Sequence, residues 1–508
     1  MWKIRIQRFH WRAKPFVGAT GPPAKPARTA GVGTNDLDGL SARDRRGRKI
    51  LDYGLLALLV WTPLPIGSVE SWSILVIEIA ALGLFSVYLL LDQKPHLSPK
   101  LLSEMRLIRP VFLGLFVFLG LQMLPLPAGI VRILSPRAAA LRSQYVPVSA
   151  QAKTATLSLL PGSTLAATLE LLAFVLIGFL VLRTVTHRKQ IRRIMLTLVV
   201  VGVFEALYGM FELYRNHPRN LFYPKTFNLN STTGTFVNRN HYAGYLEMVI
   251  PLALGLIISR FDLFGEPGTP FRARFARFLN RGLGVNLLLG IGIVVMAIAL
   301  LLSNSRSGFV VLLLSFVLMS VLTAQYFGHT RMQQGWVRRV IQIAAVSIIG
   351  FGLYIGLETM IGRFAVDRLL QDGRPRYWGG VMTMIGQFPL FGVGFGAFGS
   401  VYQAYDTTGM EYALVHAHND YLELLSELGI LGFGLLAFGV GLILFKSFRT
   451  WMARRHPELK GLALGGLASV AAIMIHSMTD FNLQIPANAL VFSVILALTM
   501  KTVYHRKT

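Results

Sequence analysis

Cysteine is absent from the 508 residues of the chain. Its absence excludes disulfide bonds, thiolate zinc sites and cysteine-held iron–sulfur clusters. Charge is also scarce, because charged residues make up 15% of the chain and hydrophobic residues 53%. With a mean hydropathy of +0.54, this balance leaves too little polar surface to solvate a globular protein of this length. The sequence therefore predicts a membrane protein.

Acidic residues are the scarcer charge, with 24 Asp and Glu against 50 Lys and Arg. Such an excess can indicate a nucleic-acid partner, but the basic residues lie mostly between apolar runs, so we expect no nucleic acid. Residues 287–302 are apolar on every face, as a helix in lipid must be.

The first 49 residues hold 12 Lys or Arg against three acidic residues and include a Pro- and Gly-rich stretch. We expect a disordered basic tail on the cytoplasmic side. No apolar core follows the first charges before residue 51, so we expect no cleavable signal peptide. The predicted division is a tail, 1–49, and a transmembrane domain, 50–508.

Apolar stretches predict an all-α, polytopic bundle of about twelve membrane spans. The short connections richest in Lys and Arg alternate with poorer ones, which places both termini in the cytoplasm. A long periplasmic loop, 361–418, is expected to carry short helices. The predicted spans lie near residues 51–67, 70–91, 110–127, 164–183, 190–214, 241–260, 284–303, 308–327, 340–360, 419–445, 461–479 and 487–503.

Several basic residues fall in outer loops, where the positive-inside tendency disfavours them. Loops 128–163 and 215–240 contain Lys and Arg but no Asp or Glu, and Arg306 stands in a tight turn, SNSRSG. Loop 361–418 adds Arg374 and Arg376. We expect an anionic partner at the outer membrane surface. The alternative is that these side chains only reach lipid headgroups.

The segment HAHNDYLELLSELG opens the tenth predicted span. Asn419, Glu423 and Glu427 share one helix face, which we expect to point inward because ionisable groups are costly in lipid. Asn419 is also a candidate substrate contact. His418 is the candidate base, since a neutral imidazole accepts protons near neutral pH. For His416 we favour a capping role. His416 and His418 could suggest a metal site. We do not expect one, because side chains two positions apart on a helix point in different directions.

The segment GTFVNRNHYAG places Asn238, Arg239, Asn240 and His241 at the outer entrance of the sixth predicted span. Their hydrogen-bond donors suit a phosphate or a sugar. The alternative is a polar helix cap, with Glu247 buried and paired to a neighbouring helix.

The segment HSMTDFNLQIPAN forms a third outer turn and carries Asp480. We treat Asp480 as a candidate substrate contact. The alternative is a tight turn in which the aspartate caps the helix.

The segment GVGFGAFG has the G-x-G-x-x-G spacing of a dinucleotide site. It follows Pro389 in an outer loop and not a buried strand, so we expect the glycines to permit close backbone turns.

The chain resembles the bacterial O-antigen ligase and polymerase superfamily. His418 and Asn419, nine residues, Gly429, two residues and Gly432 reproduce its pattern H-[NSQ]-x9-G-x-x-G. The GTFVNRNHYAG, SNSRSG, DGRPRYW and HSMTDFNLQIPAN segments are also similar to those of the superfamily. The resemblance covers about residues 160–500.

The resemblance implies glycan transfer from undecaprenyl diphosphate at the periplasmic face of the bacterial inner membrane. It implies that His418 is the essential histidine and that Arg239 and Arg306 bind the diphosphate, with Arg374 and Arg376 as further candidates. The acceptor would be lipid A core in a ligase or a second lipid-linked glycan in a polymerase. No metal or other cofactor is implied.

The sequence alone leaves three alternatives. A repeat-unit polymerase differs from a ligase only in its acceptor. A proton-coupled transporter would use Glu205, Glu247, Glu423 and Glu427 as a relay. A structural scaffold is the third.

Overall fold

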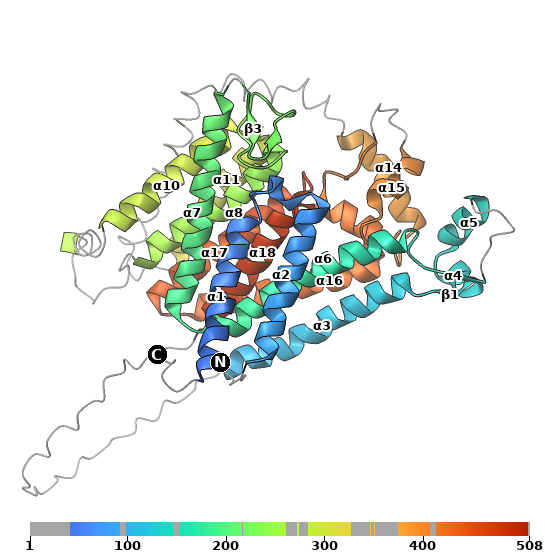
Figure 1. Ribbon diagram of the computed structural model, residues 1–508, viewed down its shortest axis with the longest axis horizontal. Coiled ribbons are helices and arrows are strands. Elements are labelled where there is room, and N and C mark those ends of the chain that lie inside the picture. Colours follow the sequence, from blue (N-terminus) through green and yellow to red (C-terminus); the bar gives the residue numbers. More distant parts are fainter. Residues whose placement is uncertain are drawn as a thin grey trace, which may run out of the picture.

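The protein is described here by a computed structural model that is helical almost throughout (Figure 1). The predicted tail before residue 41, the predicted span near 340–360 and most of the outer loop before residue 374 lie outside the described residues. The described residues are 41–91, 98–145, 153–215, 217–260, 272–273, 283–326, 346, 350, 374–406 and 413–505.

Nine of the described helices are long and apolar enough to cross a membrane. Each coincides with a predicted span, because the apolar runs of the sequence are also its helices. This confirms a polytopic membrane bundle, and the full count of twelve spans stays a prediction. The nine are α2 (Ser71–Leu89), α6 (Pro161–Thr184), α7 (Arg188–Leu213), α8 (Arg239–Arg260), α10 (Leu283–Leu302), α11 (Arg306–Tyr326), α16 (Asp420–Ala453), α17 (Pro457–His476) and α18 (Pro486–Val503).

Two further helices, α1 (Ala42–Trp61) and α3 (Pro99–Met123), match the first and third predicted spans but begin with charged turns. The helix α1 starts inside the predicted tail, because the Ser41 side chain accepts a hydrogen bond from the Asp44 amide and caps it.

Short elements occupy the connections. They are α4 (Ala128–Leu134), α5 (Pro136–Tyr145), α14 (Arg374–Gln387), α15 (Phe398–Tyr402), the 3₁₀ turns η1 (Ile66–Ser68), η3 (Gln403–Tyr405) and η4 (Asn482–Gln484), and the strands β1 (Leu126–Pro127), β2 (Thr154–Ala155), β3 (Arg219–Asn220) and β4 (Tyr223–Pro224). The strands form two antiparallel pairs, β1 with β2 and β3 with β4.

Charged helix ends gather at one end of the bundle. Lys446 near the end of α16 forms an ion pair of 3.0 Å with Glu104 at the start of α3, and Arg192 of α7 contacts Glu458 of α17 at 2.8 Å. The start of α1 lies at this end, whereas β3, α14 and α15 lie away from it (Figure 1). This grouping agrees with the alternation of basic loops in the sequence.

Helices α8 and α17 form the core of the bundle and pack with their backbones in contact. A Cβ atom on Gly255 would lie 2.7 Å from the Cα atom of Gly465, and one on Gly461 would lie 2.7 Å from the amide nitrogen of Ser259. Small residues permit this close approach of membrane helices. The seam fixes α8 against α17, and α17 leads into the turn that carries Asp480.

Candidate active site

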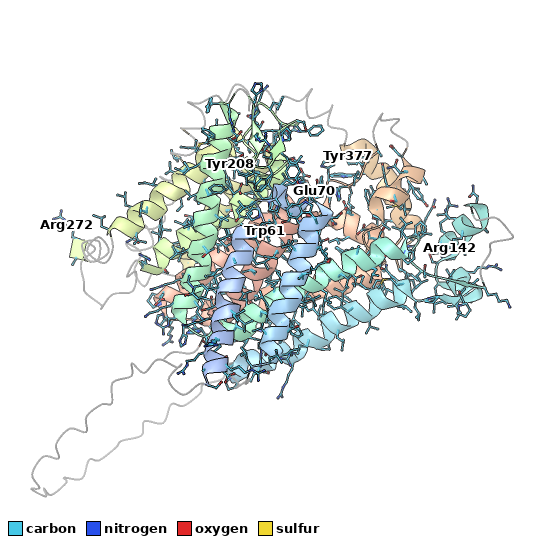
Figure 2. All side chains as sticks on the ribbon, viewed as in Figure 1. Trp61, Glu70, Arg142, Tyr208, Arg272 and Tyr377 are labelled. Atoms are coloured by element: carbon cyan, nitrogen blue, oxygen red, sulfur yellow. The ribbon has the colours of Figure 1, made fainter. Side chains whose placement is uncertain are left out.

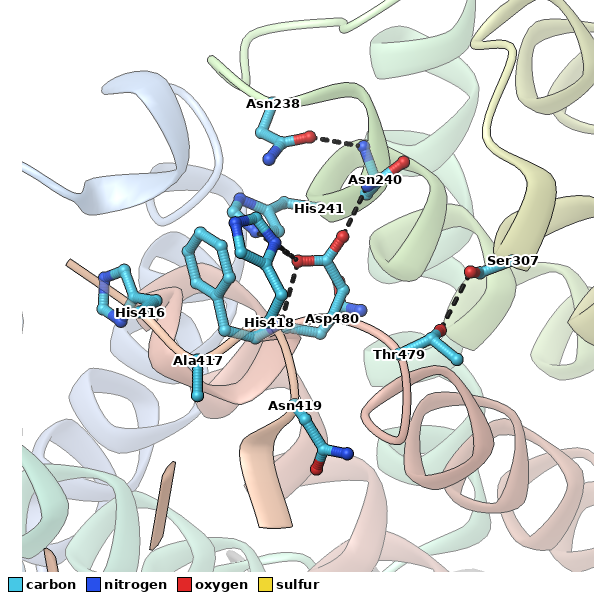
Figure 3. A network of polar contacts seen from close by, with 12 residues as sticks. Asn238, Asn240, His241, Ser307, His416, Ala417, His418, Asn419, Thr479 and Asp480 are labelled. Carbon is cyan, nitrogen blue, oxygen red and sulfur yellow. Dashed lines mark hydrogen bonds and ion pairs between the residues drawn. The ribbon is translucent and has the colours of Figure 1, made fainter. Parts of the chain in front are cut away.

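The start of α16 carries His418 in an uncommon backbone conformation. Asn419 caps the helix, because its side-chain oxygen accepts hydrogen bonds from the amides of Tyr421 and Leu422. Its amide group donates to the Met478 carbonyl, and the side chain points away from Asp480 (Figure 3). His418, just before the cap, has a φ of 48°, a left-handed value that side chains with a Cβ adopt rarely.

His418 pairs with a buried carboxylate. Its Nδ1 lies 2.9 Å from Oδ1 of Asp480, which has no solvent exposure (Figure 3). Asn240 donates to the other carboxylate oxygen, and the Phe481 amide donates to Oδ1. His241 Nε2 lies 3.8 Å from Oδ1, which is too far for a hydrogen bond but close enough for electrostatic attraction. Asp480 therefore joins α8 to the His418 loop.

The charge of Asp480 follows from these contacts. Burial raises the pKa of its carboxyl group, but the contacts with His241 and His418 outweigh burial and hold that pKa well below its usual range. The group is thus a carboxylate at neutral pH. A carboxylate at Nδ1 holds that nitrogen protonated, which leaves Nε2 of His418 as the proton-accepting nitrogen.

The first turn of α11 packs beside this pair. A Cβ atom on Gly308 would lie 2.8 Å from Cβ of Ala243, so the glycine of SNSRSG lets α11 approach the first turns of α8. Thr479, next to Asp480, donates a hydrogen bond of 2.8 Å to Ser307 (Figure 3). Arg306 is the first residue of α11 and directly precedes Ser307.

The first turn of α8 contacts the Asp480 carboxylate through Asn240. Arg239 begins this helix and is followed by Asn240. The backbone amide of Asn240 donates a hydrogen bond of 2.8 Å to the side-chain oxygen of Asn238. Consecutive Cα atoms are about 3.8 Å apart, so the backbones of Arg239 and Arg306 each adjoin a residue of the network around Asp480. Helix starts also carry partial positive charge. Two arginine-bearing helix starts therefore lie next to the turn that carries Asp480.

Arg374 and Arg376 lie in the first turn of α14, and their side chains fall outside the described residues. The same helix does reach the His418 loop. Trp378 donates a hydrogen bond of 2.8 Å to the Ala417 carbonyl, and the Tyr377 ring, labelled in Figure 2, lies 6.0 Å from the His418 ring.

Phe481 is a component of the site that the sequence reasoning missed. Its ring centre lies 4.2 Å from that of His416 in a stacked arrangement, and the rings of His418 and His241 meet it edge-on at 4.7 and 4.4 Å. Its position directly after Asp480 was the only sequence signal.

The capping role predicted for His416 is wrong. Its Nδ1 lies 2.8 Å from Oε1 of Glu423, one turn into α16, while Asn419 caps the helix. Burial lowers the pKa of His416, but the Glu423 carboxylate more than compensates, so this pKa is raised above its ordinary value.

The predicted inward face of α16 is confirmed, because Glu423 and Glu427 are both only 2% exposed. The Glu427 carboxylate accepts a hydrogen bond of 3.0 Å from the Phe398 amide. Beyond it, α16 is interrupted at Gly429, where a Cβ atom would lie 2.4 Å from the carbonyl of Leu390. The glycine-rich outer segment thus passes against the α16 backbone, and Gly392, Gly394 and Gly396 adopt the positive φ expected of close turns.

Two other expectations have clear outcomes. Glu247 is fully buried, and both its oxygens lie 3.1 Å from Nδ1 of His476 on α17, as the alternative for this segment predicted. Arg142, one of the basic residues of the outer loop 128–163 and labelled in Figure 2, donates to the carbonyl oxygens of Thr156 and Ser158 and so holds its own loop together.

Within the part of the chain that the structure describes, no three His, Asp or Glu side chains are grouped to hold a metal ion. The polar network around Asp480 is instead built from imidazole, amide and hydroxyl groups.

Comparison with known proteins identifies one family. Residues 291–437 match the family described as O-antigen ligase, a stretch that includes Arg306, His418 and the glycines of the H-[NSQ]-x9-G-x-x-G pattern. No curated protein matches the chain. Proteins of this family are membrane-embedded transferases of lipid-linked glycans, acting as ligases or polymerases. With its helical membrane bundle, the chain carries an O-antigen ligase family domain over residues 291–437.

Proposed function

We propose that the protein transfers a glycan from a lipid diphosphate to an acceptor hydroxyl at the periplasmic face of the inner membrane. The observation that carries the proposal is the contact of 2.9 Å between His418 and the buried carboxylate of Asp480, next to which α8 and α11 begin. The family match to residues 291–437 supports the reaction class.

His418 would act as the general base. Nε2 of its imidazole takes the proton from the acceptor hydroxyl, whose oxygen attacks the anomeric carbon of the donor glycan. A bond forms between that oxygen and the anomeric carbon, and the bond to the diphosphate oxygen breaks. The lipid diphosphate leaves with the electron pair, and the configuration at the carbon inverts. Asp480 stabilises the imidazolium that results.

Arg239 and Arg306 would bind the diphosphate. Guanidinium groups suit phosphate oxygens because they donate paired hydrogen bonds. The partial positive charge of the two helix starts adds to theirs. Fixed charges of this kind stabilise a leaving group as negative charge grows on it, without rearranging during the reaction.

Several side chains first considered as substrate contacts have other partners. Asn240 and Asp480 bind each other, Asn238 holds the Asn240 amide, and Asn419 caps α16. We propose that these residues, together with His241, shape the site and do not hold the sugar themselves.

Between the two acceptors we favour lipid A core, which makes the protein a ligase. A repeat-unit polymerase uses the same base and the same donor. Glycan profiling of a deletion strain tests this choice: a ligase defect leaves long polymer on the lipid carrier, and a polymerase defect leaves single repeats.

The transporter alternative needs a connected relay of carboxylates. Glu205 is instead occupied by the amide and hydroxyl of Thr235, and Glu247 by His476. These separate pairings favour structural roles for the buried acids over a relay.

The experiment is a transfer assay in proteoliposomes with a lipid-diphosphate-linked glycan donor. We expect His418→Ala to abolish transfer while the protein stays folded and inserted. The matched control is His456→Ala at the opposite end of the bundle, which should keep transfer near the wild-type rate. Transfer by the His418→Ala protein at the control rate contradicts the proposal.

A further inference from the structure

The backbone that presents His418 is held from both sides. Its neighbour Ala417 is fully buried, and both of its peptide groups are bound by side chains. The Ala417 amide donates a hydrogen bond of 2.8 Å to Oε2 of Glu423, and the Ala417 carbonyl accepts one of 2.8 Å from Trp378. Glu423 and Trp378 thus fix the two peptide groups on either side of Ala417, the residue before His418.

Glu423 uses its second oxygen on the same loop. Oε1 of Glu423 lies 2.8 Å from Nδ1 of His416. One carboxylate therefore binds both the side chain of His416 and the backbone amide of Ala417. The Glu423 side chain is 3% exposed, which shields both contacts from water. Its own amide donates to the Asn419 carbonyl, so Glu423 contacts the loop on both sides of His418.

The contacts of Glu423 with His416 and Ala417 extend to Asp480 through an aromatic ring. His416 stacks on Phe481 with an angle of 15° between the ring planes, and the same ring meets His418 edge-on. Phe481 directly follows Asp480. A change in the orientation of His416 would therefore act on the Phe481 ring, which also contacts His418.

We propose that Glu423 is a positioning residue that keeps His418 aimed at Asp480. A left-handed histidine is strained and persists only where its surroundings impose that conformation. The carboxylate of Glu423 supplies that constraint by holding His416 and Ala417 together. The inference rests on the proposed role of His418 as the base and adds the group that orients it.

The test compares substitutions at two matched positions. Glu423 and Glu427 lie one turn apart on α16 and are equally buried. The Glu427 carboxylate, however, accepts its hydrogen bonds from the Phe398 and Gly396 amides and acts on His416 only electrostatically, whereas Glu423 binds the His418 loop directly. We expect Glu423→Ala to lower kcat about 10- to 100-fold, as misplacement of a reacting group does, with little change in the KM of the donor. Glu423→Gln keeps an acceptor for the Ala417 amide and should recover part of kcat. Glu427→Gln should keep kcat within a small factor.

A second measurement does not depend on turnover. Hydrogen–deuterium exchange of the peptide that covers residues 413–419 should be faster in Glu423→Ala, which removes the acceptor of the Ala417 amide, than in the wild-type protein, and unchanged in Glu427→Gln. Unchanged exchange in Glu423→Ala, equal losses of kcat at both positions, or a raised donor KM at constant kcat would each overturn the inference.

The two proposals fail in distinguishable ways. If His418→Ala retains transfer, the role of His418 as base is wrong whatever Glu423 does. If His418→Ala is inactive while Glu423→Ala matches Glu427→Gln in exchange and kcat, only the positioning role is wrong.

Discussion

Asp480 and His418 meet at 2.9 Å although 62 positions separate them in the chain. Each residue comes from a connection at the same end of the bundle, Asp480 from the turn between α17 and α18 and His418 from the loop before α16. Helix packing brings the two connections together, and burial of the carboxylate makes the contact strong.

We expect Asp480→Asn to lower kcat about 100-fold or more, because an amide neither fixes the Nδ1–H tautomer of His418 nor stabilises its protonated form. The folded-state pKa of Asp480 is depressed, so its stabilising contribution is fully present above the unfolded value of about 3.9 and is lost only as the pH falls through the depressed pKa. The carboxylate itself therefore does not titrate between about pH 5 and about pH 8, and Asp480→Asn should lose thermal stability at both. A kcat equal to that of the wild type would refute the catalytic role.

His416 should give the protein a measurable pH dependence of stability. Its folded-state pKa is raised, so the stabilisation is fully present below the unfolded value of about 6.5 and disappears as the pH rises through the folded pKa. In His416→Gln, thermal unfolding in detergent should show the largest deficit below about pH 6.5 and a smaller one at higher pH. A deficit that grows with rising pH would contradict the Glu423 pairing as its cause.

Arg306→Ala should lower kcat/KM for the lipid-diphosphate donor about 100-fold, since it removes a fixed positive charge from the site of the leaving group. Arg306→Lys should recover part of this loss by restoring charge without paired donors. Inorganic diphosphate should also inhibit the Ala variant less than the wild type.

Arg132, on the exposed face of α4, provides the control for Arg306. Arg132→Ala removes one outer positive charge away from the site and should leave kcat/KM unchanged. Equal losses in the two variants would indicate a general surface-charge effect.

The Glu247–His476 pair predicts a stability phenotype. Both side chains are fully buried, so Glu247→Ala leaves an unpaired imidazole and should cost about 3–5 kcal/mol of unfolding free energy. Glu247→Gln retains a hydrogen-bond partner and should cost less. A double-mutant cycle with His476→Ala checks the assignment, because additive losses in thermal unfolding would show that the two residues act independently.

The helices were predictable because their signal is local. The segment of α10 is apolar on every face, and no packing information is needed to place such a segment in lipid. The inward face of α16 was also predictable, because the cost of exposing Glu423 and Glu427 to lipid decides which way the helix turns.

The contacts of the site were not predictable in the same way. The partner of Asn240 is Asp480, 240 positions away, and no local sequence pattern indicates that the two residues are in contact. The left-handed conformation of His418 likewise depends on Glu423 and Trp378, which belong to different helices. A residue pattern identifies polar groups at an outer edge, but tertiary packing decides which of them bind one another.

The close glycine packing between α8 and α17, within the membrane, can affect the geometry of the site at the membrane edge. Gly255 lies fifteen residues beyond Asn240, or about 22 Å along α8. Widening the helix pair at this depth changes how the two helices pack along their length, and their far ends carry Asn240 and the turn with Asp480. A single methyl group added at Gly255 would thus disturb the donor that holds the carboxylate, without touching a glycan or a phosphate.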